Sequence, residues 1–132
     1  MVGNGTGLAG LLAHLKARIQ AGAHRNWLVY GERNAAHDAL HGDVLSSWLA
    51  HGQLAFLDRV YSRDGQAQRY VQHALRDQAD RLLAWVEQGA AIYVCGSLQG
   101  MAPAVHETLA EVLGPDRLAG MASEGRYRRD VY

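Results

Sequence analysis

The chain alternates short apolar runs with longer amphipathic stretches, and turn-forming residues separate the two. The short runs are bounded by Gly, Asn, Asp or Ser, which is typical of β-strands in a buried sheet. They predict strands at residues 1–2, 27–30, 54–61, 92–95 and 127–131. The first run is too short for a full strand, so we expect a first strand that is truncated.

The longer stretches carry apolar side chains at helical spacing. In the stretch 8–20 one face holds Leu8, Leu11, Leu12, Leu15 and Ile19. Further helices are expected at about 43–50, at 71–87 as one helix or a split one, and at 101–113. Strands that alternate with helices predict an α/β fold: a three-layer, doubly wound parallel sheet of about five strands, similar to the Rossmann fold.

Length and charge narrow the possible partners. A chain of 132 residues is one domain, here 1–132, and its 13 Lys and Arg balance 13 Asp and Glu. No overall field therefore favours nucleic acid or an anionic membrane. The chain has one cysteine, no signal region and no apolar run near the roughly 20 residues that span a bilayer. We expect a cytoplasmic location, no membrane contact by this chain and no disulfide framework.

A glycine-rich turn follows the first expected strand. Residues 3–10 read Gly-Asn-Gly-Thr-Gly-Leu-Ala-Gly, with a G-x-G-x-x-G pattern at Gly5, Gly7 and Gly10. Such glycines let the backbone approach a pyrophosphate, which backbone N–H groups and the helix N-terminus then bind. The pattern predicts a dinucleotide site at Gly5, Thr6 and Gly7; a tight turn without a ligand is the alternative.

The residues after the next two strands bear on the choice of nucleotide. Glu32 would bind a ribose 2′-hydroxyl and favour NAD, whereas Arg33 would pair with a 2′-phosphate and favour NADP. Ser62 and Arg63 follow the third strand, and a hydroxyl beside a guanidinium suits a phosphate dianion. This pair favours NADP.

Four further blocks carry a family resemblance. They are Ser62-Arg63-Asp64, Tyr70-Val71-Gln72-His73, Tyr93-Val94-Cys95-Gly96 and the closing Arg126-Tyr127-Arg128-Arg129-Asp130-Val131-Tyr132. With the glycine turn, their order and spacing resemble the NADPH-binding lobe of diflavin reductases, the ferredoxin-NADP reductase-like family that includes cytochrome P450 reductase and the sulfite reductase flavoprotein. The resemblance extends over nearly the whole chain. A final tyrosine in place of tryptophan favours the bacterial sulfite reductase type.

The resemblance implies roles at the adenosine end of NADPH. Ser62 and Arg63 would bind the 2′-phosphate, Tyr70 would stack on the adenine and Gln72 would touch the adenosine. The family commonly has a basic residue two positions before the tyrosine. This chain has Gln68 there and Arg69 one place later, so the role of Arg69 stays open.

The resemblance also implies roles at the hydride end. Cys95 would pack against the nicotinamide, beside cofactor contacts from Gly96, Ser97 and Met101. Asp130 would assist hydride transfer. Tyr132 would cover the flavin ring until the nicotinamide displaces it. Cys95, Asp130 and Tyr132 are thus the predicted catalytic residues.

The chain departs from the family pattern at three positions. Asn4 and Gly10 stand where the family turn has prolines, which removes some rigidity but no phosphate donor. Ser97 stands where the family usually has aspartate, so a carboxylate near the nicotinamide is lost.

His37 and His41 have the spacing of helix-face metal ligands, but no cysteine or carboxylate set completes a site, and we expect no metal.

These observations predict an NADPH-binding domain of a flavin-dependent oxidoreductase. It would pass hydride from NADPH to FAD on a flavin-binding domain or chain absent here, and electrons would continue to FMN or to a heme or sulfite reductase partner, with the terminal acceptor left open. The FAD and FMN domains are missing, so we expect no turnover by this fragment alone. The parent protein could also be anchored at the cytoplasmic face of a membrane. A stand-alone NADP(H)-binding module and an NAD-linked Rossmann dehydrogenase are the alternatives, the latter motivated by Glu32.

Overall fold

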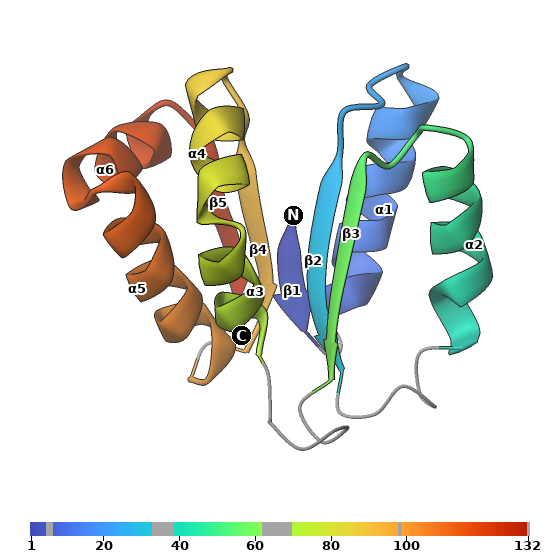
Figure 1. The fold of residues 1–132 in the computed structure, drawn as a ribbon, viewed down its shortest axis with the longest axis horizontal. Coiled ribbons are helices and arrows are strands. Elements are labelled where there is room, and N and C mark those ends of the chain that lie inside the picture. The colour runs from blue at the N-terminus through green and yellow to red at the C-terminus, as the bar shows by residue number, and fades with distance from the viewer. Residues whose placement is uncertain (5–6, 33–38, 62–69, 98, 132) are drawn as a thin grey trace.

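A parallel β-sheet forms the centre of the molecule, with helices on both faces (Figure 1). The computed structural model describes residues 1–4, 7–32, 39–61, 70–97 and 99–131. The sheet has five strands in the order β3-β2-β1-β4-β5, all paired in parallel. Their bounds are Val2–Asn4 (β1), Trp27–Glu32 (β2), Phe56–Tyr61 (β3), Ile92–Gly96 (β4) and Tyr127–Val131 (β5). The predicted fold class is confirmed.

The described helices divide between the two faces of the sheet. One face is covered by α1 (Gly7–Gln20) and α2 (Ala39–Ala50). The other is covered by α3 (Val71–Asp77), α4 (Ala79–Glu87), α5 (Met101–Leu113) and α6 (Pro115–Ser123). The chain thus changes faces after β3, and the strand order reverses between β1 and β4. None of these helices has both the length and the apolar character needed to cross a bilayer.

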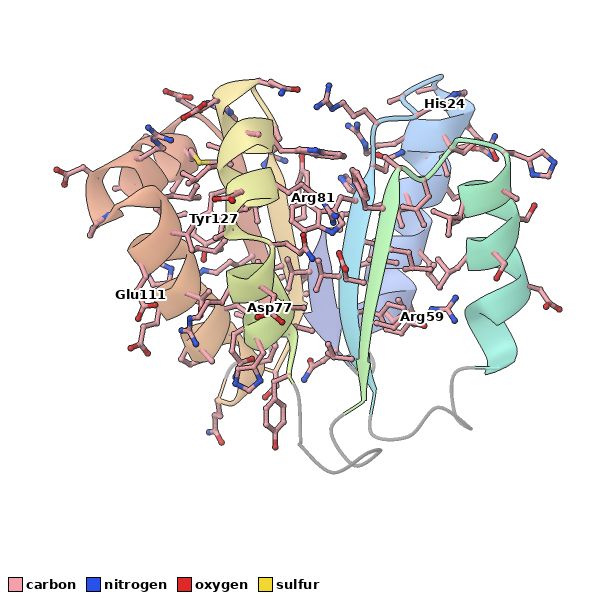
Figure 2. The ribbon with its side chains drawn as sticks, viewed as in Figure 1. His24, Arg59, Asp77, Arg81, Glu111 and Tyr127 are labelled. Carbon is pink, nitrogen blue, oxygen red and sulfur yellow. The ribbon has the colours of Figure 1, made fainter. Side chains whose placement is uncertain are left out.

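The core consists of two layers, because β2 is buried on both sides (Figure 2). Trp27 and Val29 pack with the helices α3 to α6, whereas Leu28 and Tyr30 pack with α1 and α2. Successive strand residues point to opposite faces, so a strand covered on both sides needs a continuous apolar run. This requirement accounts for the apolar run of residues 27–30.

The predicted strands are all present, with shifted ends. β1 reaches Asn4, β2 reaches Glu32 and β4 reaches Gly96. β3 begins only at Phe56, because the Leu54 amide donates to the Trp48 carbonyl and so closes the turn after α2. Polar or glycine residues at a strand end carry no hydrophobic periodicity, so the pattern alone could not extend the strands.

The helix predictions are confirmed with one correction: the helix expected at about 43–50 begins earlier, at Ala39. Of the two alternatives for the stretch 71–87, the structure has the split helix, with the break at Gln78. Helix α6 was not predicted from the sequence. Its signals were Pro115 at the first helical turn and the buried pair Leu118 and Met121, three residues apart. From the sequence, the preceding helix was expected to end at residue 113, and no helix was expected after it.

Candidate functional site

The carboxyl ends of the five strands lie along one edge of the sheet, at the bottom of Figure 1. The last strand residues there are Asn4, Glu32, Tyr61, Gly96 and Val131. In open α/β sheets, ligands bind outside this edge at the point where the strand order reverses. That point lies between β1 and β4, so the candidate site is centred on Asn4 and Gly96.

Several predicted site residues lie outside the described part of the chain. They are Gly5, Thr6, Arg33, Ser62, Arg63 and Tyr132, together with Gln68 and Arg69. Four of them, Gly5, Arg33, Ser62 and Tyr132, each follow directly on the last residue of a strand that ends at this edge. Gly7 is the first residue of α1. The roles predicted for these residues remain predictions.

Cys95 and Asp130 are brought together by the sheet. They are register partners on the neighbouring strands β4 and β5. Cys95 is partly buried and faces α1, since a Cβ added to Gly10 would lie 3.9 Å from its Sγ. Burial raises the pKa of the Cys95 thiol; Asp130 raises it further, and the Met1 amino group opposes the change. The thiol therefore stays protonated at neutral pH, which suits a packing role rather than a nucleophilic one.

Gly96 leaves bare backbone at the end of β4. Its φ of 145° lies in a region that residues with side chains rarely adopt. A Cβ there would also collide with Asn4 Oδ1 and with the terminal methyl group of Met101. The rest of the Met101 side chain is in the core, and the residue is only 6% exposed. Only glycine fits this position.

Ser97 organises the turn between β4 and α5. Its N–H donates to Asn4 Oδ1 at 3.4 Å, and its carbonyl accepts from the Ala102 N–H at 2.9 Å. Its hydroxyl oxygen accepts from the Gly100 N–H at 3.1 Å. Ser97 was predicted to contact the cofactor in place of the family's aspartate. Its hydroxyl is engaged by the backbone of this turn.

Tyr70 is the residue that precedes α3, and its ring is displayed at the same edge. The residue is 44% exposed. Its backbone N–H donates to His73 Nδ1 at 3.0 Å, and the two rings lie 5.7 Å apart at 55°. Gln72 is partly buried in the first turn of the same helix. An exposed aromatic ring held in this way can stack on a planar ligand.

His73 is a site residue that sequence reasoning missed. It was quoted only as part of a motif, with no role. The available signal was its position three residues after the helix-capping position, where a side chain can reach back to the capping backbone N–H. Here that contact fixes the Tyr70 backbone.

A cavity of about 340 Å³ lies at the opposite edge of the sheet. Its lining includes Met1, Trp27 and Ile92, which lie at or near the amino ends of their strands. The Met1 amino group donates to the Trp27 carbonyl at 2.7 Å, and burial, with Arg18 nearby, lowers the pKa of this amine to about 5. Because ligands of open α/β sheets bind at the carboxyl edge, we do not assign the site to this cavity.

Among the residues that the structure describes, no three His, Cys, Asp or Glu side chains are grouped as metal ligands would be. His37 lies outside those residues, and the side chain of His41 is likewise not described. The structure therefore contributes no test of a site formed by this pair.

Comparison with known proteins gives consistent results. The family model described as "Oxidoreductase NAD-binding domain" matches residues 1–107. The sulfite reductase [NADPH] flavoprotein alpha-component of Bacillus subtilis is 35% identical over the whole chain, which spans 24% of that protein. The same component of Klebsiella pneumoniae is 38% identical, with 24% covered, and that of Vibrio cholerae is 36% identical, with 23% covered.

The chain thus spans about a quarter of the length of these relatives, and the match lies in their C-terminal part. The fold agrees with the match: a five-stranded parallel sheet with a switch point between β1 and β4 is the architecture of a dinucleotide-binding domain. On both grounds, the chain belongs to the oxidoreductase NAD-binding domain family and is related to the flavoprotein component of sulfite reductase.

Proposed function

We propose that this chain is the NADPH-binding domain of a flavin-dependent reductase and presents the nicotinamide of NADPH to a flavin held by another domain. The observation that carries the proposal is the pair Cys95 and Asp130, side by side on β4 and β5 next to the switch point. The relatives are named as NADPH-dependent flavoproteins, which supports NADPH and a flavin partner.

At the hydride end, the proposed roles follow from the chemistry of the described side chains. The neutral Cys95 thiol is small and polarizable and gives the nicotinamide a packing surface without a charge. Asp130 is exposed and carries a carboxylate, which can stabilise the positive charge that develops on the nicotinamide as hydride leaves. Tyr132 follows in the chain and is proposed to cover the flavin.

At the adenosine end, Tyr70 is proposed to stack on the adenine, with Gln72 beside it. Ser62 and Arg63 are proposed to bind the 2′-phosphate, and Arg33 to contribute a second cation. Gly5, Thr6 and Gly7 are proposed to bind the pyrophosphate with backbone N–H groups at the start of α1.

The flavin belongs to another part of the parent protein. FAD would accept the hydride and pass electrons onward, and the acceptor is set by domains outside this chain. Donor and acceptor atoms must approach to roughly 3–3.5 Å, which requires a docked flavin domain. We therefore expect this chain alone to bind NADPH without turning it over.

The test is calorimetric titration of the chain with 2′,5′-ADP and with 5′-AMP at low salt. The two ligands differ only by the 2′-phosphate. We expect 2′,5′-ADP to bind at least about tenfold more tightly, because charge-assisted hydrogen bonds to phosphate contribute roughly 1.5–3 kcal/mol each. Equal binding would favour the NAD-linked alternative, and binding of neither ligand would overturn the proposal.

The variant Arg63→Ala tests whether Arg63 causes the preference for 2′,5′-ADP over 5′-AMP. Arg63→Ala should weaken 2′,5′-ADP roughly 10- to 100-fold and leave 5′-AMP nearly unchanged. Arg117→Ala, which changes an exposed arginine on the distant helix α6, is the matched control and should change neither. Equal weakening of both ligands by Arg63→Ala would show that Arg63 does not read the 2′-phosphate.

A different experiment distinguishes a stand-alone NADP(H)-binding module from a domain of a flavin-dependent reductase. If the parent protein supplies an FAD domain, addition of that domain should give NADPH oxidation with a flavin-dependent acceptor. Tight NADPH binding without oxidation under those conditions would favour the stand-alone module.

A further inference from the structure

The side chain of Asn4 bridges the two strands at the switch point. Asn4 is the last residue of β1, and its Oδ1 accepts a hydrogen bond from the Ser97 N–H, 93 residues away, at 3.4 Å. On the other side, a Cβ added to Gly31 of β2 would lie 3.9 Å from the Asn4 Cβ. Asn4 therefore lies between β2 and β4, at the point where the sheet reverses its order.

The contact extends into the turn that leads to α5. Gly96 packs so closely on Asn4 that any side chain at position 96 would meet Oδ1. Ser97 then binds the first turn of α5, through its hydroxyl to Gly100 and its carbonyl to Ala102. One side-chain acceptor on β1 thus connects, through Ser97, to Gly100 and Ala102 at the start of α5.

Proline could not make this contact. A proline at position 4 would fix the backbone but would offer no side-chain acceptor to the Ser97 N–H. Asparagine gives up that backbone restriction and supplies a hydrogen bond between strands instead. Asparagine in place of the family's proline at position 4 therefore exchanges a restriction on the local backbone for a hydrogen bond between Asn4 and Ser97.

We propose that Asn4 is a positioning residue for the nicotinamide half of the NADP(H) site: it holds Gly96 and Ser97 in the place where the nicotinamide and its ribose would bind. The inference rests on the proposed function. Because Asn4 would act through Gly96 and Ser97, its effect should be confined to ligands that carry nicotinamide.

The test compares NADP⁺ with 2′,5′-ADP, which lacks the nicotinamide, on Asn4→Ala. We expect NADP⁺ to bind about 3- to 10-fold more weakly, the range for loss of one hydrogen bond, and 2′,5′-ADP to change less than about twofold. Retained 2′,5′-ADP binding also reports that the variant is folded. If Asn4→Ala does not fold, Asn4→Ser, whose side chain is too short to span the contact, replaces it.

Asn4→Asp is the matched rescue, because it keeps an oxygen at the same position. It should retain the preference for NADP⁺ over 2′,5′-ADP that Asn4→Ala loses. Hydrogen exchange of the Ser97 amide gives a readout in the absence of ligand, and it should be faster in Asn4→Ala and close to wild type in Asn4→Asp.

The outcomes separate the two proposals. Failure of the wild-type chain to bind 2′,5′-ADP would overturn the proposed function and the inference with it. Normal wild-type binding, with both ligands weakened equally in Asn4→Ala or with unchanged Ser97 exchange, would overturn the inference alone.

Discussion

At the residue scale, the chemistry of Cys95 is set by its surroundings. The thiol is partly buried against α1 and lies beside the Asp130 carboxylate, and both effects raise its pKa. A reactive cysteine needs the opposite environment, with exposure and nearby positive charge. Cys95 is therefore suited to contact a ligand ring without reacting with it.

This environment predicts slow alkylation of Cys95. Because the folded pKa is raised, the thiolate should appear only at higher pH than in an unfolded chain, and the rate against pH should have its midpoint shifted upward. Asp130→Asn removes one cause of the shift, so the rate at pH 8 should rise at least about twofold. The measurement is iodoacetamide labelling followed by mass spectrometry.

Asp116→Asn is the control, since Asp116 is an exposed carboxylate at the start of α6. It should leave the labelling rate unchanged. Equal labelling rates in wild type and Asp130→Asn would mean that burial alone raises the pKa of the Cys95 thiol.

At the element scale, α4 is fastened to the sheet by a polar contact. Arg81 of α4 pairs with Asp58 of β3 at 3.3 Å, and both side chains are about one-quarter exposed (Figure 2). Asp58 also accepts from the Trp27 indole N–H at 2.5 Å, while the Arg81 guanidinium lies 3.7 Å from the Phe56 ring centre. One carboxylate thus links a helix with two strands.

Removal of this carboxylate should destabilise the fold. Asp58→Ala leaves the Trp27 indole without its acceptor and Arg81 without its ion pair, so we expect a loss of about 1–3 kcal/mol in the free energy of unfolding. Asp58→Asn keeps an acceptor for the indole and should lose less. Urea denaturation measures both.

The matched control is the ion pair of Arg76 with Glu111, which joins α3 and α5 at 3.2 Å. Its side chains are 52% and 53% exposed, and Arg76 also donates to Thr108. Glu111→Ala should therefore change stability by less than about 0.5 kcal/mol. Similar losses of unfolding free energy in Asp58→Ala and Glu111→Ala would show that Asp58 stabilises the fold no more than an exposed ion pair does.

At the scale of the whole molecule, the two edges of the sheet carry different sets of residues. The carboxyl edge gathers Tyr70, Gly96 and the pair Cys95 and Asp130, whereas the opposite edge holds a cavity whose lining includes Arg18, Arg25 and Trp27. This arrangement follows from parallel pairing, because every strand ends at the same edge.

Hydrogen exchange should locate the ligand on the molecule. We expect 2′,5′-ADP to protect amides at the start of α3, near Tyr70 and Gln72, and NADP⁺ to protect the turn at 96–100 as well. Amides of residues 88–91, beside the cavity, should not respond to either ligand. Protection confined to 88–91 would move the site to the opposite edge.

Much of this protein could be predicted from local sequence. Hydrophobic periodicity gave the strands and four of the helical regions, because the repeats that bury one face of a helix or both faces of a strand are visible among neighbouring residues. The family resemblance is confirmed by the match of residues 1–107 to the family model, whereas the roles of the candidate residues remain predictions. The missed helix α6 shows the limit: it has 9 residues, and its helical spacing shows only in one buried pair, Leu118 and Met121.

The sequence by itself determined the fold class, the strand and helix regions and the types of residue available for nucleotide binding. Only the tertiary structure decided which of them meet: Cys95 with Asp130 across β4 and β5, and Asn4 with Ser97 across the switch point. Those partners are 35 and 93 residues apart, so no local pattern records their proximity. It arises from the order of strands in the sheet, which long-range burial of the two core layers fixes.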